Sequence, residues 1–431
     1  MAENKSRRVS SVKVRARAIA ILLMVILALG VAEAPAYSVL THEQIVDLLW
    51  KDQIQPMLKS RFPNTSDDEL RTAHAYAYGG SMVQDMGYYP FGNKFFSDLL
   101  HYVRSGDFVL NLLHEATDVN EYGFALGALA HYVSDNTGHP TINRVVAIEF
   151  PKLRRKFGDV VTYNDDKKAH IRTEFGFDMV QVAKNRYTSD RYHDFIGFEV
   201  AKPLLERAFL STYGLKLGDV FGDTDLAIGT FRRSVSVVIP EMTRVALLSR
   251  KEQMIKEDPT FDQKKFLFYL SRTNYQKQWG TGYRKPGIGT RFLSWLLNVI
   301  PKVGPFAALQ FKIPTQQTED LYIKSVTQTV EDYHAVLHKA DANALHLPNL
   351  DCDTGKPTAA GEYQLSDTTY ATLLEKLSKN HFDDVSPELR AEVLRFYAGP
   401  QPVQKPNRKS KKEKQSWEET QKYLKELQSS R

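Results

Sequence analysis

Apolar residues recur at helical spacing along most of the chain, and the strict alternation typical of strands is rare and short. Two capping-box pairs, Thr41 with Gln44 and Ser66 with Glu69, each precede a stretch with this spacing. Residues 251–400 continue the helical pattern around a segment rich in glycine and proline. The pattern therefore predicts a mainly α protein, a multi-helix bundle with additional helices toward the C-terminus.

Two predicted helices in the first half of the chain are bounded by clear signals. One covers residues 120–137, which are rich in Ala and Leu, and is predicted to end at Gly138 and Pro140 because both residue types terminate helices. The other is predicted to begin at Asp165, after the candidate N-cap Asn164, and to run to about residue 184. Acidic residues in its first turn favour the helix because they complement the helix dipole.

The N-terminus has the pattern of an export signal. Six basic residues precede an apolar run of 15 residues, Ala18 to Ala32, and Glu33 is followed by the small-x-small site Ala34-Pro35-Ala36. The run is shorter than the ~18–20 residues that usually span a bilayer, so a cleaved signal is favoured over an anchor. Cleavage after Ala36 would make Tyr37 the first residue of a secreted or periplasmic protein.

Composition and charge exclude several classes of protein. The proportions of hydrophobic (42%) and charged (25%) residues exclude a collagen or a disordered chain, and the single Cys352 excludes an internal disulfide. Residues 1–36 hold six basic and two acidic residues, so their removal lowers the net charge from +6 to +2. Residues 401–431, a Lys-rich tail predicted to be flexible with a short terminal helix, carry nine basic and four acidic residues. Residues 37–400, predicted to divide into 37–250 and 251–400, therefore carry a slight net negative charge.

Histidine and acidic residues are concentrated in one part of the chain. Seven of the twelve histidines fall between His42 and His170. His131 and Asp135 are four positions apart on one predicted helix, and His170 and Glu174 repeat the spacing on the next. Residues four apart project from the same helix face. A single pair arises often by chance, but two pairs among apolar neighbours indicate a zinc site, because buried imidazoles and carboxylates need partners.

The order of these residues resembles that of the zinc-dependent phospholipase C family and the related single-strand-specific zinc nucleases of fungi and plants. The family signature is an N-terminal aromatic residue followed by a fixed order of histidines and acidic residues. In this chain the signature falls on Tyr37, His42, Asp85, His101, His131, Asp135, His139, His170 and Glu174. The resemblance covers about residues 37–180 and implies a mainly α-helical bundle that binds up to three zinc ions.

The resemblance also implies how the ligands are divided. One zinc would be bound by Asp85, His101, His131 and Asp135. A second zinc would be bound by His139, His170 and Glu174. The third would be bound by the amine and carbonyl of Tyr37 with His42, and would share Asp135. The chain departs from the family pattern in having Tyr for Trp at position 37 and in placing His139 only four positions after Asp135, where the family usually has six.

The activity implied by the resemblance is that of a phosphoric diester hydrolase. The foremost reading is a phospholipase C that cleaves the glycerol–phosphate ester of phospholipids with a hydroxide that bridges the metals, which Asp85 orients or deprotonates. The alternatives are a zinc-dependent single-strand nuclease and a non-catalytic zinc-stabilised binding protein. A phosphohydrolase of the HD type, suggested by His193-Asp194, is disfavoured because one such dipeptide arises easily by chance.

Two segments are candidates for contact with a phospholipid membrane. Residues 291–311 are strongly apolar and flanked by cations, although Pro301 and Pro305 interrupt their periodicity and favour a buried element. The basic tail is the second candidate. A nuclease would need aromatic residues along a basic groove, and the low net charge of the mature chain weighs against that alternative. The sequence leaves the oligomeric state open.

Overall fold

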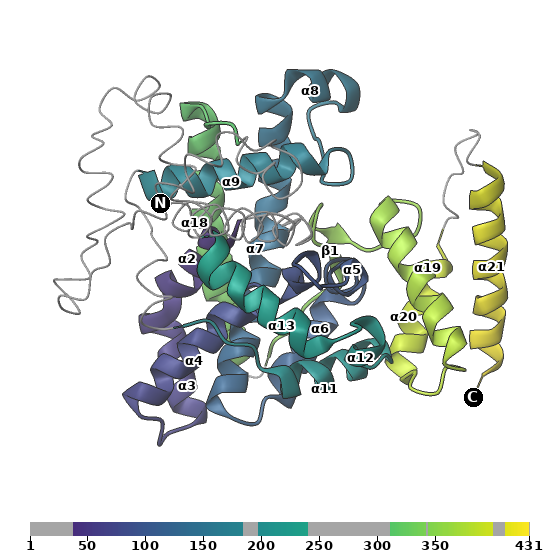
Figure 1. Ribbon diagram of the computed structural model, residues 1–431, viewed down its shortest axis with the longest axis horizontal. Helices are drawn as coiled ribbons and strands as arrows, with labels where there is room; N and C mark the ends of the chain where they lie inside the picture. Colours follow the sequence, from purple (N-terminus) through teal and green to yellow (C-terminus); the bar gives the residue numbers. More distant parts are fainter. Residues whose placement is uncertain (1–37, 184–196, 240–310, 342–343, 400–409, 431) are drawn as a thin grey trace, which may run out of the picture.

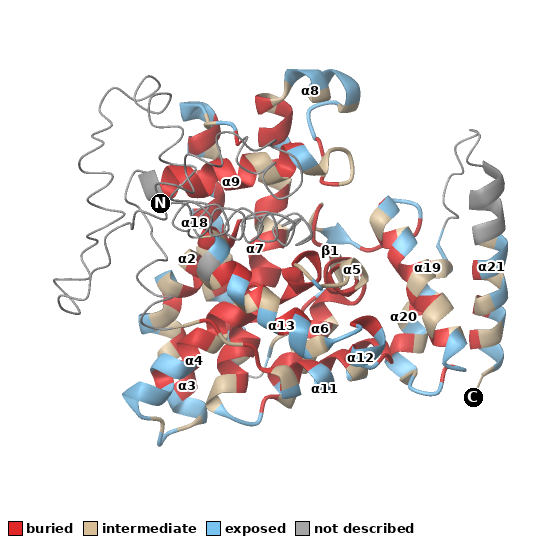
Figure 2. Ribbon diagram, in the orientation of Figure 1, coloured by how far each residue is buried: buried red, intermediate tan, exposed pale blue. Residues whose placement is uncertain are grey.

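A long helix, α7 (Val119–Glu149), lies in the interior of the molecule, and helices from both halves of the chain pack against it (Figure 1). This computed structural model describes residues 38–183, 197–239, 311–341, 344–399 and 410–430. Most of α7 is buried, as Figure 2 shows, because it contacts α4 (Asp67–Gly80) and α18 (Gln316–Asp341) along its length. The fold is mainly α, as the hydrophobic pattern predicts.

The other elements are shorter than α7. Before α7 the chain forms α2 (Val39–Leu49), a π-helical segment (Trp50–Ile54), α3 (Gln55–Arg61), a 3-10 helix (Val83–Tyr88), α5 (Lys94–Tyr102) and α6 (Ser105–Glu115). After α7 it forms α8 (Pro151–Phe157), α9 (Lys167–Ala183), α11 (Lys202–Tyr213), α12 (Leu217–Val220), α13 (Thr224–Arg233) and a second π-helical segment (Ser234–Val238). The C-terminal part contains α19 (Gln364–Lys379), α20 (Pro387–Tyr397) and α21 (Ser410–Ser429). An antiparallel pair, β1 (Leu350–Asp351) and β2 (Lys356–Pro357), provides the only strands of the described residues. No helix among the described residues is long and apolar enough to cross a membrane.

Glycines allow α4 and α7 to pack with their backbones almost in contact. A Cβ atom on Gly127 of α7 would lie 2.0 Å from the carbonyl oxygen of Ala77 on α4. Conversely, a Cβ atom on Gly80 of α4 would lie 1.9 Å from the carbonyl oxygen of Phe124. No real side chain fits at these distances, so only glycine permits this approach.

Replacing Gly127 with alanine is expected to lower the free energy of unfolding by about 3 kcal/mol, because the helices must move apart. Gly229→Ala is the matched control. Gly229 is exposed on α13, and a Cβ atom added to it would have no other atom within 4 Å, so alanine should stabilise the protein by up to about 1 kcal/mol. Denaturant unfolding of both variants measures the difference. Equal stability of Gly127→Ala and the native chain would contradict the close packing.

The helix that carries His131 is longer than the sequence predicts. The sequence pattern places its end at Gly138 and Pro140, but α7 continues through both to Glu149. Pro140 has no N–H group, so the carbonyl of Asn136 loses its helical hydrogen bond. Gly355, in the turn between β1 and β2, packs against this carbonyl: a Cβ atom there would lie 2.7 Å from the oxygen. A distant segment therefore packs against the carbonyl that the proline leaves unbonded, and the helix continues past the proline.

Of the three helix caps that the sequence predicts, the structure has one. Ser66 and Glu69 form the predicted capping box of α4. At the start of α2 the prediction is wrong, because Ser38 precedes the helix and Thr41 lies inside it. Asp166 and not Asn164 caps α9, since its carboxylate accepts a hydrogen bond from the Ala169 amide at 2.9 Å.

The C-terminal region is helical, as predicted, but its last helix is longer than expected. The predicted short helix of the basic tail is the 20-residue α21, which packs against α19 through the buried Leu424 and Leu427 (Figure 1). An apolar face recurs along this Lys-rich segment, and its burial stabilises the helix. The apolar segment 291–310 and the dipeptide His193-Asp194 lie outside the described residues.

Candidate metal centre

Five predicted ligands from four elements form one buried cluster of side chains, here called the first pocket. His42 comes from α2, Asp85 from the 3-10 helix, His101 from α5, and His131 and Asp135 from consecutive turns of α7. The ligand atoms of His42, His131 and Asp135 lie within 4.8 Å of one another, as do those of Asp85, His101 and His131. These side chains, separated by up to 93 positions in the sequence, therefore have the arrangement of a metal site.

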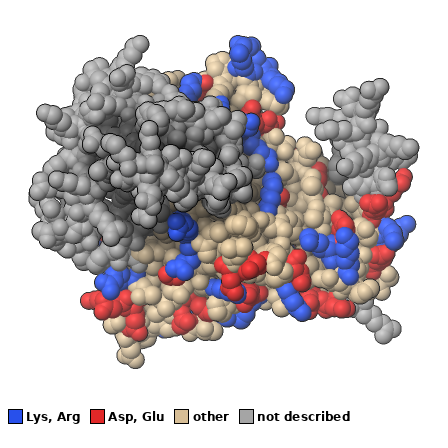
Figure 3. Space-filling model, in the orientation of Figure 1, with Lys and Arg blue, Asp and Glu red and all other residues tan. Residues whose placement is uncertain are grey.

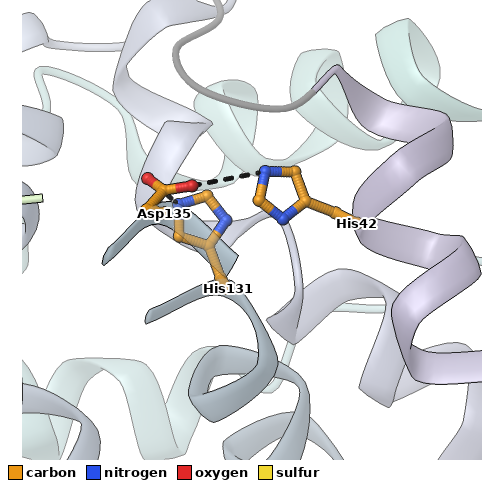
Figure 4. A group of neighbouring side chains, drawn as sticks. All are labelled: His42, His131 and Asp135. Carbon is orange, nitrogen blue, oxygen red and sulfur yellow. Dashed lines mark ion pairs between the residues drawn. The ribbon is translucent and has the colours of Figure 1, made fainter. Parts of the chain in front are cut away.

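Asp135 is the centre of this pocket. Its carboxylate lies 3.1 Å from Nε2 of His131, 3.2 Å from Nε2 of His101 and 3.6 Å from Nε2 of His42. His42 and His131 stack with their ring centroids 4.3 Å apart, and both face the carboxylate, as Figure 4 shows. One carboxylate shared by three imidazoles is suited to bridge two cations, which is the role that the resemblance implies.

Backbone hydrogen bonds fix which nitrogen each histidine presents. Nδ1 of His131 donates to the carbonyl of Ser81 at 2.8 Å, and Nδ1 of His101 donates to the carbonyl of Ser97 at 2.7 Å. A carbonyl can only accept, so the proton of each neutral ring is on Nδ1. Nε2 then carries the lone pair and faces the pocket, which is the usual arrangement of a metal-binding histidine.

Unbonded carboxylate oxygens show that the pocket fits a cation. Neither oxygen of Asp85 accepts a hydrogen bond, although the residue is completely buried, and Oδ1 lies 3.5 Å from Nε2 of His101. An unsatisfied buried carboxylate is costly. The oxygens of Asp135 are likewise without a hydrogen bond. Histidine nitrogens and carboxylate oxygens are the donors that zinc accepts, so the set fits this metal.

A second cluster, here called the second pocket, begins at the next turn of α7 and consists of His139, His170 and Glu174. Because this helix continues past Pro140, His139 follows Asp135 on nearly the same face, and the short spacing is accommodated. On α9, Nε2 of His170 donates to the carbonyl of Val161 at 2.7 Å, and Nδ1 lies 3.5 Å from Oε1 of Glu174. The rings of His139 and His170 are 6.4 Å apart.

The second pocket also contains unsatisfied ligand atoms. Nε2 of His139, Nδ1 of His170 and Oε1 of Glu174 are buried and make no hydrogen bond. Nδ1 of His139 donates to the carbonyl of Cys352 at 2.6 Å, which leaves Nε2 as the ligating atom. The ligand atoms of the second pocket are farther apart than those of the first. Within the described ranges, only the two groups of the first pocket have three ligand atoms within 4.8 Å of one another.

Burial shifts the pKa of several groups in both pockets. It raises the pKa of Asp85 and of Glu174 well above the usual range of carboxyl groups. It lowers the pKa of His139 and His170, so both imidazoles are neutral and able to bind a metal at pH 7. Burial also acts to raise the pKa of Asp135, but the surrounding histidines, His131 first, outweigh it and hold this pKa well below its usual value.

The comparison with known families agrees with this geometry. Residues 41–221 match the family model described as zinc-dependent phospholipase C. Over these residues the chain is similar to that family. No curated protein and no solved structure matches the chain.

The match to the zinc-dependent phospholipase C family indicates the class of activity. The protein is a zinc-dependent hydrolase of the phospholipase C and nuclease type. All predicted ligands except Tyr37 lie within the matched residues. Tyr37 lies outside the described residues, so the predicted third zinc site is represented here by His42 and Asp135 alone.

Asp178 fixes the position of the segment that leads into His42. Its carboxylate accepts hydrogen bonds from the Leu40 amide at 3.1 Å and from the Thr41 hydroxyl at 2.8 Å. Asp178 lies on α9, one turn after Glu174. The helix that carries part of the second pocket therefore also holds the start of α2. Asp178 is not among the residues predicted from the sequence, although it repeats the i, i+4 spacing of His170 and Glu174.

Asp178 is expected to make the stability of the protein depend on pH. Burial raises its pKa to about 6, against about 3.9 in the unfolded chain, so folding favours the protonated form. Its contribution to stability is therefore complete below pH 4 and is lost as the pH rises through 6, a change of about 3 kcal/mol. In Asp178→Asn the amide can bond both Leu40 and Thr41 without titrating. The difference in unfolding free energy between the two proteins should change by this amount between pH 4 and 7, and a constant difference would contradict the assignment.

Asp353 is a second residue of the site that the sequence did not predict. It lies in the turn between β1 and β2, and Oδ1 is 3.4 Å from Nδ1 of His139, 214 positions earlier in the chain. The sequence offers only a weak signal, two aspartates flanking the single cysteine (351–353), because nothing in that pattern reveals which helix the turn contacts.

Proposed function

We propose that the protein is a phospholipase C that hydrolyses the glycerol–phosphate ester of phospholipids, and that it acts after export to the cell exterior or the periplasm. The observation that supports the proposal best is the convergence of buried imidazole and carboxylate side chains from five elements in two adjacent pockets, where Asp85, Asp135, His139, His170 and Glu174 have ligand atoms without a hydrogen bond. The residues that would bind zinc are His42, Asp85, His101, His131, Asp135, His139, His170 and Glu174, with Tyr37 as the further predicted ligand.

Zinc bound there would lower the pKa of water and neutralise the charge of the phosphoryl oxygens. Within the chain, Ser81 and Ser97 hold the rings of His131 and His101 through their carbonyls, so Nε2 of each ring keeps its direction. Asp85 is the candidate general base. Its Oδ2 is buried and makes no hydrogen bond, so it is available to accept a proton from the attacking water.

Charge favours a lipid over a nucleic acid as the substrate. On the face drawn in Figure 3, basic and acidic side chains alternate over the described residues, whereas a nuclease would present a continuous basic groove. Basic residues gather at α8, whose last turn contains Arg154, Arg155 and Lys156, all exposed. Such a cluster could attract anionic lipid, in addition to the predicted contacts through 291–311 and the basic tail.

Turnover assays with two substrates test the proposal. Zinc-loaded protein is incubated with phosphatidylcholine vesicles or with single-stranded DNA, and phosphocholine, diacylglycerol and nucleotides are measured. We expect phosphocholine and diacylglycerol, their loss after chelation, and their recovery when zinc is returned. Release of nucleotides alone would establish the nuclease alternative. Bound zinc without turnover of either substrate would instead indicate a zinc-stabilised binding protein.

A further inference from the structure

We propose that Asp353 is a fourth protein ligand of the second metal ion, together with His139, His170 and Glu174. The inference rests on the proposed function in that it takes this pocket to bind zinc. It adds a ligand from outside the residues that match the family, which end at position 221.

One oxygen of Asp353 is held in place while the other remains available. Oδ2 accepts hydrogen bonds from the hydroxyl groups of Tyr102, at 2.9 Å, and Tyr363. Oδ1 makes no hydrogen bond, although only 1% of the residue is exposed. A carboxylate with one oxygen oriented by tyrosines and the other unsatisfied has the environment expected of a metal ligand with outer hydrogen-bond partners.

Asp353 does not simply orient the ring of His139. Nδ1 of His139 already donates its proton to the carbonyl of Cys352 at 2.6 Å. The 3.4 Å contact between this nitrogen and Oδ1 of Asp353 is not a hydrogen bond. The orienting role that a carboxylate often has beside a metal-binding histidine is therefore filled by a backbone carbonyl, and Oδ1 stays free to bind the ion.

The backbone around Asp353 is fixed to α5 and α7, two of the helices that line the pockets. The Cys352 amide donates to the carbonyl of His101 on α5 at 3.1 Å. The carbonyl of Asp353 accepts a hydrogen bond from the side chain of Asn143 on α7 at 2.8 Å. Gly355 packs against Asn136, as described above. These contacts hold the turn at the second pocket, so placement of Asp353 there does not depend on its own side chain.

A second carboxylate also improves the charge balance of the buried site. Zinc with two neutral imidazoles and Glu174 alone would carry a net positive charge away from water. Asp353 makes the set neutral, which lowers the cost of burying it. Two imidazoles and two carboxylates also complete the four ligands that zinc commonly takes. A fourth ligand is significant here because His139 enters the second pocket from an unusual position, four residues after Asp135.

Zinc content per chain tests the inference. Elemental analysis is made on the full-length mature protein and on Asp353→Asn, His139→Gln and the double variant, all purified with zinc and without chelators. We expect each single variant to contain one ion fewer than the native protein, and the double variant to lose no second ion, because both residues would serve one site. Asp351→Asn is the matched control: both of its oxygens accept hydrogen bonds within the same turn, so zinc content should not change.

The possible results separate this inference from the proposed function. Native protein without zinc would overturn both. Native zinc content in Asp353→Asn, with the ion lost from His139→Gln, would overturn the role of Asp353 alone. If Asp353→Asn does not fold, as judged by circular dichroism, a crystal structure of the zinc-loaded native protein decides: Asp353 must lie within about 2.2 Å of an ion, and a longer separation overturns the inference.

Discussion

Asp135→Asn is expected to remove zinc from the first pocket and to lower the rate of hydrolysis at least a hundredfold. The asparagine keeps the shape of the side chain but loses the charge that lies within 3.6 Å of His42, His101 and His131. Changes to the outer partners of a metal site already cost about 10–100-fold, so loss of a shared ligand should cost more. Elemental analysis and the phosphocholine assay measure the two effects.

Asp332→Asn is a suitable control for this prediction. Asp332 lies on α18 and accepts a hydrogen bond from the Thr137 hydroxyl at 2.9 Å, so it contacts α7 two residues from Asp135 but outside the pocket. Its replacement should leave zinc content and activity near those of the native protein. Unchanged zinc content in Asp135→Asn would show that the pocket is not the metal site.

Removal of zinc is expected to lower the melting temperature by more than about 10 °C at pH 7. The two pockets then hold carboxylates in buried positions without a compensating cation, Asp85, Asp135 and Glu174 among them. A ligand at a thousand times its dissociation constant stabilises the folded state by about 4 kcal/mol, hence about 8 kcal/mol for two sites. In domains of this size each kcal/mol corresponds to about 2–4 °C.

Thermal melts after chelation measure this effect, and added metals supply its control. Zinc should restore the original melting temperature, whereas magnesium should not, because it prefers oxygen ligands and retains its waters. Chelated protein that has lost its zinc and melts at the native temperature would show that the pockets do not depend on a cation for stability.

The two largest predictions both depend on pairs that the sequence reveals directly. His131 with Asp135 and His170 with Glu174 share a helix face because residues four apart always do. The helical fold class, the capping box at Ser66 and the presence of a metal centre follow from equally local signals. The predicted export signal and the ligand role of Tyr37 come from the sequence too, and remain predictions, since those residues lie outside the described part of the chain.

What only the tertiary structure decided is where distant segments meet. Helix α7 continues past Pro140 because the turn near Gly355 packs on the carbonyl that the proline leaves unbonded. The same turn brings Asp353 to His139 across 214 positions. Local spacing and propensity act over one or two helical turns, whereas such contacts arise from the packing of the whole core. The sequence by itself therefore determined the helices and the ligand pairs, and tertiary packing determined the continuity of α7 and the neighbours of the second pocket.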